Sequence, residues 1–484
     1  MKGGVRDNAG RKSLNEESKK KGYRVYLTKE EYESILGCGV GKSFSEKCGN
    51  LISKGIDASN NEKKSKCVTF IDLFAGLGGM RLGFETAFDN MGIETKCVFS
   101  SEIKKYAVDA YLKYFENEKV YGDITRIKAS QIPDFDYLLA GFPCQPFSSA
   151  GKGRGFADTR GTLFFEIERI LREKKPLGFL LENVEGLMMH DGGYTLNVIL
   201  EHLKKLGYKV NYALLDSKEF GLAQSRKRVY IVGTKTDEIP LKNFMKKSSL
   251  FEDIMERRIE TIDSEFTKSL LKNYDIKSLE GKSIKDKRGG KNNIHSWEIE
   301  IKGPTSNDQR RLLEALLKMR RRKKWAEEIG IDWMDGMPLT INQIRTFFDH
   351  EDLKRMLEDL VKKGYLTFEH PRMMKDRSRI PDTSKPKGYN IVAGKLSFEF
   401  SKILDSKGLV PTLVATDVMK LGVVDGTGLR RLTVREGQRL CGYPEEYDLS
   451  FLKEKEAFDL LGNTVCVPVI VEISKRLAEL HQRL

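Results

Sequence analysis

The sequence predicts an α/β fold with a doubly wound, mainly parallel sheet, and three observations indicate it. Short apolar segments alternate with helical patterns between residues 66 and 235, which is typical of a parallel sheet covered by helices on both faces. A glycine-rich turn follows the first apolar segment, at the sheet edge where such folds bind ligands. The chain then becomes more polar and irregular, which predicts a smaller mixed domain.

The strands and the domain organisation follow from this pattern. Strands are predicted at 67–73, 96–100, 136–140, 178–182, 209–214 and 228–233. The chain divides into a basic N-terminal extension (1–62), the sheet domain (66–235), the polar segment (236–427) and a C-terminal segment (428–484). The last of these ends in an amphipathic helix at 469–480, which we expect to pack back onto the sheet domain.

The N-terminal extension is rich in lysine and predicts a short strand followed by two helices. Arg24–Leu27 has the pattern of a strand, and Thr28 with Glu31 forms a capping box for the first helix. Ser43 with Glu46 starts the second helix. This order resembles a ribbon-helix-helix DNA-binding module, and a basic tail with two docked helices is an equally good interpretation.

The composition indicates a globular protein and favours a nucleic-acid partner. The 484 residues are 39% hydrophobic and carry a formal net charge of +14. Excess cations commonly neutralise phosphates, although charge alone fits a merely basic protein equally well. No segment approaches the roughly 20 apolar residues that span a membrane, and the polar N-terminus has no export signal. We therefore expect a cytoplasmic protein with no membrane partner.

The cysteines and histidines predict neither a disulfide framework nor a metal site. The six histidines form no cluster, and the seven cysteines are scattered without a Cys-x-x-Cys pair. This usage fits a reducing compartment, where a single thiol can stay reactive. The cysteines are Cys38, Cys48, Cys67, Cys97, Cys144, Cys441 and Cys466.

Two features of the polar segment suggest contact with nucleic acid. A basic run at 318–324 ends before Trp325. Residues 340–369 have the pattern of two helices and a strand, which predicts a winged helix-turn-helix. No code links such side chains to particular bases, so the sequence predicts no recognition sequence.

A nucleoside site is predicted at the carboxyl edge of the sheet. The strand ending in Asp72-Leu73 runs into Phe74-Ala75-Gly76-Leu77-Gly78-Gly79, whose glycines let the backbone approach a ligand at the start of a helix. Glu102, after the next strand, can bind ribose hydroxyls, and Asp123 closes a third loop. The alternative is a purely structural turn. It is not a phosphate loop, because no Gly-Lys-Ser/Thr follows.

A nucleophile and its partners are predicted at the same edge. A strand delivers Cys144 onto a loop flanked by Pro143 and Pro146, and the glycine- and serine-rich stretch 148–160 can close as a lid. The alternative for a lone cysteine is inert packing. Glu182 stands at a strand end, and Arg226 and Arg228 share one face of an extended segment. Two guanidiniums there suit phosphate or carbonyl recognition.

In this order and spacing, the motifs resemble the bacterial DNA (cytosine-5)-methyltransferases of restriction–modification systems. The similarity covers about 66–235 and 428–484. In that family the stretch between the Gln-x-Arg-x-Arg and Thr-x-Arg-Glu motifs is the target-recognition domain, here 236–427. The matching pieces are Asp72-Leu73-Phe74-Ala75-Gly76-x-Gly78-Gly79, Pro143-Cys144-Gln145, Glu182-Asn183-Val184, Gln224-x-Arg226-x-Arg228, Thr433-Val434-Arg435-Glu436, Gly442-Tyr443-Pro444 and Leu461-Gly462-Asn463-Thr464-Val465.

The resemblance implies a Rossmann-like fold, S-adenosylmethionine as cofactor and methyl transfer to a cytosine flipped out of double-stranded DNA. Cys144 would attack C6 of the base, and Glu182 would protonate N3. Arg228 would bind the base carbonyl and Arg226 would help to hold the nucleotide.

The resemblance also assigns binding residues. Cofactor contacts are implied for Phe74, Gly76, Leu77, Gly79, Glu102, Asp123, Ile124, Pro143, Leu163, Asn463 and Val465. DNA contacts are implied for Ser148, Lys152, Arg154, Arg160 and Gln224. Three positions depart from many relatives: Ile103 replaces an aromatic residue, Leu460 replaces a glutamine, and Ala150 stands where some members enter the DNA with a polar residue.

Two alternatives stay open at this point. The substrate can be cytosine in RNA, although a large target domain is more expected for duplex DNA. The N-terminal extension can also act as a transcriptional regulator beside the enzyme. The catalytic unit is expected to be a monomer, with a dimer through the extension as the alternative.

Overall fold

The computed structural model describes residues 27–37, 42–52, 67–116, 118–143, 163–287, 289–375, 378–392 and 398–484. The chain divides into two compact units, Met1–Lys66 and Cys67–Leu484.

The first unit contains two helices with the caps that the sequence predicts. Helix α1 (Lys29–Gly37) begins after Thr28, whose hydroxyl accepts from the Glu31 amide at 3.2 Å while the Glu31 carboxylate accepts from the Thr28 amide at 2.7 Å. A second helix spans 44–52. The Tyr32 and Phe44 rings pack 4.6 Å apart. Residues 24–26 lie outside the described part of the chain, so the ribbon-helix-helix module stays a prediction.

The second unit is built on a seven-stranded sheet with the order β3-β2-β1-β4-β5-β8-β6. All neighbouring strands are parallel except β8, which runs antiparallel to both β5 and β6. All six predicted segments are confirmed as strands to within two residues, and β3 is added. The strands are β1 (Val68–Leu73), β2 (Thr95–Ser101), β3 (Val120–Tyr121), β4 (Tyr137–Gly141), β5 (Gly178–Val184), β6 (Lys209–Asp216) and β8 (Lys227–Thr234).

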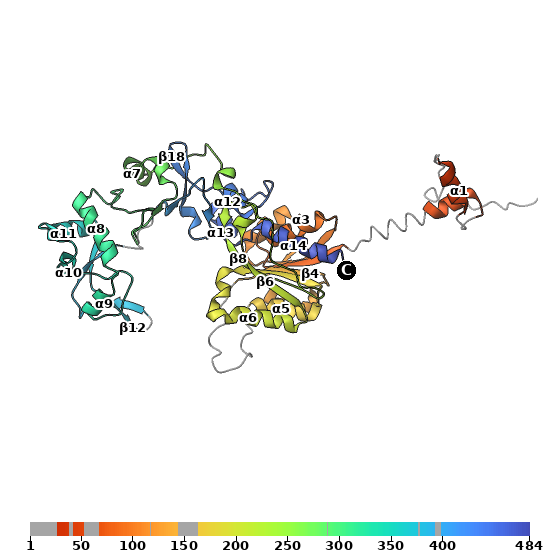
Figure 1. Ribbon diagram of the computed structural model, residues 1–484, viewed down its shortest axis with the longest axis horizontal. Helices are drawn as coiled ribbons and strands as arrows, with labels where there is room; N and C mark the ends of the chain where they lie inside the picture. Colours follow the sequence, from red (N-terminus) through yellow and green to blue (C-terminus); the bar gives the residue numbers. More distant parts are fainter. Residues whose placement is uncertain are drawn as a thin grey trace, which may run out of the picture. The chain divides into compact units, whose positions relative to one another are not determined.

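Helices cover both faces of this sheet, as the alternation of strands and helices predicts (Figure 1). Helices α5 (Leu163–Lys174) and α6 (Tyr194–Lys205) pack on the face that carries Ile71, Leu181 and Ile231. Helices α3 (Gly79–Asp89) and α14 (Val467–His481) cover the opposite face. Helix α14 belongs to the C-terminal segment, so the end of the chain completes the sheet domain.

The remaining elements are further helices and shorter strands, most of which follow the sheet domain along the chain. A five-stranded sheet has the order β10-β9-β15-β17-β18, and β7 pairs in parallel with β16. The helices are α4 (Lys105–Tyr114), α7 (Glu265–Asn273), α8 (Asn307–Met319), α9 (Lys324–Ile329), α10 (Ile341–Arg345), α11 (Leu353–Lys362), α12 (Val434–Cys441) and α13 (Glu454–Asn463). The strands are β7 (Gln224–Ser225), β9 (Ser283–Ile284), β10 (Asn293–Ile294), β11 (Leu366–Glu369), β12 (Arg372–Lys375), β13 (Ser378–Pro381), β14 (Gly388–Ile391), β15 (Lys402–Ile403), β16 (Val410–Pro411), β17 (Leu421–Asp425) and β18 (Gly428–Arg431).

One described segment, Glu454–His481, is long and apolar enough to cross a membrane by composition. It consists of the two helices α13 and α14, and 67% of its most apolar stretch is buried inside the protein. Its apolar character is therefore explained by packing against the sheet.

Gly78, the residue before α3, offers a test of how tightly the first turn is packed. Gly78 has φ 70°, and a Cβ there would lie 2.4 Å from the Phe115 ring. Gly92 has nearly the same φ, 71°, but a Cβ there would meet nothing within 4 Å. We expect Gly92→Ala to cost about 1–2 kcal/mol through backbone strain. Gly78→Ala should cost at least about 1–3 kcal/mol more through overpacking. Urea unfolding of both variants measures the difference, and equal losses would contradict the clash.

Candidate active site

The glycine-rich turn after β1 has the backbone that its sequence predicts. Phe74, Gly76 and Gly78 have φ of 56°, 54° and 70°, in the left-handed region. Glycine adopts this region at little cost, whereas for Phe74 it is a strained conformation of the kind that concentrates at functional sites. The chain thereby reverses sharply and starts α3 at the carboxyl edge of the sheet.

Glu102 holds this turn through its carboxylate. Its Oε2 accepts a hydrogen bond from the Gly76 amide at 2.9 Å. Its Oε1 accepts from the amides of Ile103 at 2.8 Å and Lys104 at 2.9 Å. Because each carboxylate oxygen has two lone pairs, Oε2 keeps one acceptor position for a ligand hydroxyl.

A cavity of about 310 Å³ lies between this turn and the C-terminal segment. Nine of the eleven predicted cofactor residues line it, together with Glu182, Arg226 and Arg228. The nine are Phe74, Gly76, Leu77, Gly79, Glu102, Pro143, Leu163, Asn463 and Val465. The wall also contains residues to which the sequence analysis assigned no contact: Ala75, Met80, Ile103, Lys104, Ala107, Gly141, Phe142, Val184, Leu460, Gly462 and Thr464.

Asp123 and Ile124 are not among the described residues that line the cavity. The Asp123 carboxylate accepts from the backbone amide and hydroxyl of Thr125, at 3.0 and 2.7 Å, and so caps a short 3-10 helix. These bonds lower the pKa of Asp123. Ile124 is buried in the core on the α5 side of the sheet. The structure thus shows a local role for each residue, and their cofactor contacts stay a prediction.

The predicted nucleophile lies outside the described residues. Cys144 and the predicted DNA-contacting residues Ser148, Lys152, Arg154 and Arg160 belong to 144–162, which the structure does not describe. Strand β4 ends at Gly141, which pairs in register with Glu182 on β5. Pro143, the residue before Cys144, lines the cavity.

Glu182 and Arg228 form a buried pair at this edge. The antiparallel register sets Val184 opposite Arg228 and Glu182 opposite Tyr230, so the two side chains are diagonal neighbours on one face. The Arg228 Nε–H donates to Glu182 Oε1 at 3.1 Å. Burial raises the pKa of Glu182, and the charges of Arg228 and Arg226 only partly offset this. Burial and the nearby Arg226 lower the pKa of Arg228. The site therefore favours a neutral Glu182.

Arg226 has backbone contacts that the sequence did not predict, and its predicted contact with the nucleotide stays a prediction. Its guanidinium donates to the carbonyl oxygens of Leu413 at 3.2 Å, Gly462 at 3.0 Å and Thr464 at 2.5 Å. These bonds fasten the C-terminal segment, whose residues 462–465 line the cavity. Arg226 is thus a positioning residue that also adds positive charge near Glu182.

Gln224 is not placed to contact DNA, contrary to its predicted role. Its side chain is fully buried. The amide nitrogen donates to the Leu440 carbonyl at 2.9 Å, and the amide oxygen accepts from the Leu413 backbone amide at 3.1 Å. Sequence reasoning missed this because both partners lie about 190 to 220 residues away along the chain.

Arg226→Lys is expected to lower the free energy of unfolding by about 2 kcal/mol. A single ammonium cannot reproduce the three carbonyl contacts, which leaves buried carbonyl groups without donors. Thermal and urea unfolding measure the loss. The matched control is Lys227→Ala, at the exposed neighbouring position, which should stay within about 0.5 kcal/mol of the native chain. Equal stability of both variants would contradict the fastening role.

Side chains of the C-terminal motifs contact the glycine turn and stabilise it. The Tyr443 and Thr464 hydroxyls are 2.5 Å apart, and a Cβ on Gly79 would lie 2.5 Å from the Tyr443 oxygen. The Tyr447 hydroxyl donates to the Leu77 carbonyl at 2.6 Å. The motif Gly442-Tyr443-Pro444 is visible in the sequence, but nothing in it predicts which turn it supports.

Asp72 is a further group that the sequence did not select. It is fully buried, and among the described residues neither carboxyl oxygen has a hydrogen-bond partner. Burial raises its pKa well above the ordinary value, and the charge of Arg81 only partly offsets this. An acidic residue within an apolar strand is the signal that marks such a position.

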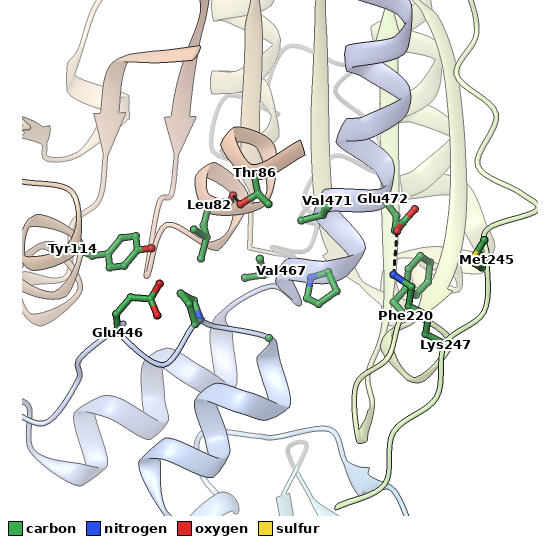
Figure 2. Close-up of a pocket in the computed structure, with 13 residues that line it drawn as sticks. Leu82, Thr86, Tyr114, Phe220, Met245, Lys247, Glu446, Val467, Val471 and Glu472 are labelled. Atoms are coloured by element: carbon green, nitrogen blue, oxygen red, sulfur yellow. Dashed lines mark hydrogen bonds and ion pairs between the residues drawn. The ribbon is translucent and has the colours of Figure 1, made fainter. Parts of the chain in front are cut away.

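A second cavity, of about 400 Å³, lies beside α3 and α14 (Figure 2). Apolar side chains including Leu82, Val467 and Val471 form much of its wall, and an ion pair of 3.8 Å joins Lys247 to Glu472. None of the predicted site residues is among its described lining, whereas the first cavity is lined by Glu182, Arg226, Arg228 and most of the predicted cofactor residues. Within the described parts of the chain, no three metal-ligating side chains come together.

Comparisons with known proteins establish the family. The family C-5 cytosine-specific DNA methylase matches residues 68–479. Type II methyltransferase M.NlaIV of Neisseria lactamica is 54% identical over 417 residues, which are 85% of this chain and 98% of that protein. Type II methyltransferase M.BanI of Aneurinibacillus aneurinilyticus is 40% identical over 436 residues, 85% of this chain and 95% of that protein. The solved S. pombe Dnmt2 methyltransferase covers 86% of this chain and 99% of its own, with 16% identity and a TM-score of 0.44. The chain therefore belongs to the C-5 cytosine-specific DNA methylases and is a DNA (cytosine-5)-methyltransferase of the restriction–modification type.

Proposed function

We propose that the protein transfers a methyl group from S-adenosylmethionine to C5 of a cytosine flipped out of a short specific duplex sequence. The reaction passes through a covalent bond between Cys144 and C6, and the product protects cytoplasmic host DNA from a restriction enzyme. The observation that carries the proposal is one cavity lined by the glycine turn, by Glu102 and by the buried Glu182–Arg228 pair.

The residues of this cavity suit the cofactor. The free acceptor position on Glu102 fits a ribose hydroxyl, and Phe74, Leu77 and Ile103 offer apolar surface to a base. The backbone of the glycine turn carries no Cβ at Gly76, where a Cβ would meet only the Phe74 carbonyl oxygen at 3.9 Å, and this allows close approach of a ligand. When bound, S-adenosylmethionine supplies an electrophilic methyl group on a sulfonium.

The chain's own residues then activate the base. The Cys144 thiolate forms the bond to C6, and the displaced electron pair moves through the ring towards N3. The proton of neutral Glu182 passes to N3, which balances that charge and leaves C5 nucleophilic. Arg228 binds the base carbonyl. After methylation a general base, a water or a side chain, removes the C5 proton. The C6–sulfur bond then breaks, and N3 returns its proton to Glu182.

The target has to leave the duplex before it can meet these groups. Segment 236–427 is assigned to sequence recognition, and Ser148, Lys152, Arg154 and Arg160 are assigned to contacts with the DNA around the flipped base. The strongly basic composition, +14 overall, supports binding to phosphates.

Radiolabelled methyl transfer tests the proposal. Label from S-adenosylmethionine is expected to enter duplex DNA and not transfer RNA. Incorporation into RNA alone would overturn the choice of substrate. Duplex DNA with 5-fluorocytosine at the target should stop the reaction at the covalent stage, because the fluorine blocks the release step. Peptide mapping of the trapped complex should find Cys144, and a different residue would overturn the assigned nucleophile.

A further inference from the structure

The stretch 307–392 has the element order of a winged helix. Helix α8 is followed by the short helix α9 and then by Leu339, which forms an isolated antiparallel bridge with Tyr389. Helices α10 and α11 come next, then β11, which pairs antiparallel with β14. In the chain between β11 and β14, strands β12 and β13 pair as an antiparallel hairpin. Apart from the short α9, this order of helix, bridge, two helices and a hairpin-bearing strand pair matches a helix-turn-helix with a wing, which the sequence predicted for 340–369.

Helices α8, α10 and α11 lie close together in this stretch, the 307–392 subdomain (Figure 1), and a shared apolar core sets the direction of α11. Leu353, Met356 and Leu360 of α11 are buried in that core with side chains from α8 and α10. Arg320 after α8 is also buried, and its guanidinium donates to Asn390 Oδ1 at 2.6 Å. A hydrogen bond thus joins the end of α8 to β14. The face of α11 opposite its buried residues faces outward.

The outward face of α11 carries charged side chains. Lys354, Arg355, Glu358 and Lys362 are all exposed and recur at helical spacing. Among the described residues, Arg355 forms an ion pair only with Asp352, at 3.1 Å, and its side chain is 80% exposed. Such exposed pairs are weak and exchange readily for other partners.

The hairpin adds an exposed, basic and partly apolar surface. Arg372 on β12 and Arg379 on β13 are exposed, and so are Met373 and Met374. Apolar side chains exposed on a short strand pair are costly unless a partner covers them.

We propose that α11 is the helix that reads the recognition sequence in the major groove, with the β12–β13 hairpin against the neighbouring backbone. This rests on the proposed function, which supplies duplex DNA as the occupant. The major groove is about 12 Å wide and admits one helix. Three cations on the exposed face of α11 match the charge of DNA. Arg355 and Glu358 together offer the donor for guanine and the acceptor for cytosine that base reading uses, whereas a face that only bound phosphates would need cations alone.

The test replaces Arg355 by alanine in the full-length protein. A lost base contact is expected to raise KM for the cognate duplex about 5- to 150-fold, with most of the change in KM and not in kcat. Bisulfite sequencing of methylated DNA should show relaxed choice at one base position. Arg372→Ala with Arg379→Ala should raise KM for all sequences alike and reduce its salt dependence.

Arg311→Ala on α8 is the matched control. Arg311 is 74% exposed and pairs with Asp308 three residues earlier, as Arg355 pairs with Asp352. It should change KM less than about threefold and leave the methylated sequence as it is. Thermal unfolding checks that all variants fold. If the native chain methylates a specific duplex and Arg355→Ala keeps both KM and sequence choice, α11 is not the reading helix. If the native chain methylates no duplex at all, it is the proposed function that fails.

Discussion

Cys144→Ser is expected to reduce methyl transfer to duplex DNA by about 10⁴-fold or more, because a serine hydroxyl is not ionised at neutral pH and cannot add to C6. Binding of DNA and of S-adenosylmethionine should persist, since neither depends on the thiolate. Single-turnover transfer of labelled methyl measures the loss, and gel-shift titration measures the retained binding. Turnover within tenfold of the native protein would move the nucleophile to another residue.

Other cysteines of the chain provide the controls. Cys67→Ser, at a half-buried position before β1, should leave turnover within about twofold. The buried thiols cannot take over the reaction, because burial raises the pKa of Cys97 to about 11 and that of Cys466 to about 12. A thiolate is the reactive form, so these groups stay inert near neutral pH.

Glu182→Gln is the second large effect, expected to lower kcat by about 10²- to 10⁴-fold. The amide can still accept from Arg228, but it has no acidic proton to give to N3. Glu185→Gln is the matched control three residues later, with a side chain 53% exposed, and should leave kcat within about twofold. If the Glu182→Gln variant turned over about as fast as the control, Glu182 would not be the acid that protonates N3.

The pH dependence of the native protein follows from the same group. Burial raises the pKa of Glu182, so folding favours its neutral form, and Arg228 only partly opposes this. The contribution of neutral Glu182 to activity and to stability is therefore complete below the ordinary carboxyl pKa and is lost as pH rises through the raised value. We expect a falling high-pH limb in kcat that Glu182→Gln abolishes. A limb that persists in the variant would belong to another group.

The fold of the sheet domain was largely predictable because its information is local. Its longer strands, from Val68–Leu73 to Lys227–Thr234, are short runs rich in apolar residues and were predicted, whereas the two-residue strand Val120–Tyr121 was not. The direction of β8 was not predictable in this way. Nothing within Lys227–Thr234 says that the strand lies antiparallel between β5 and β6, since that depends on pairing with distant segments.

The site was predictable where residue type alone decides the chemistry. As expected, one cavity is lined by Glu182, Glu102 and the glycine turn. We predicted that Gln224 contacts DNA and that Arg226 helps to hold the nucleotide, because a sequence shows that these side chains can form hydrogen bonds. It does not show which groups are their partners in the folded chain. Their partners, among them the carbonyls of Leu413 and Thr464, come close only in the folded chain.

The completion of the sheet by α14 has a consequence for biosynthesis. The face of the sheet that carries Phe70, Leu180 and Val232 is covered partly by Ile470, Ile473 and Leu477, which are translated long after the strands they cover. At a translation rate of roughly 5–20 residues per second, the nascent chain exposes this apolar face of the sheet for about 10–50 seconds after residue 235 is made. Chaperones that hold apolar surface have that interval in which to act. A polypeptide that terminates before residue 462 also lacks residues 462–465 of the cavity wall, so it misses part of the cavity as well as the helix that covers the sheet.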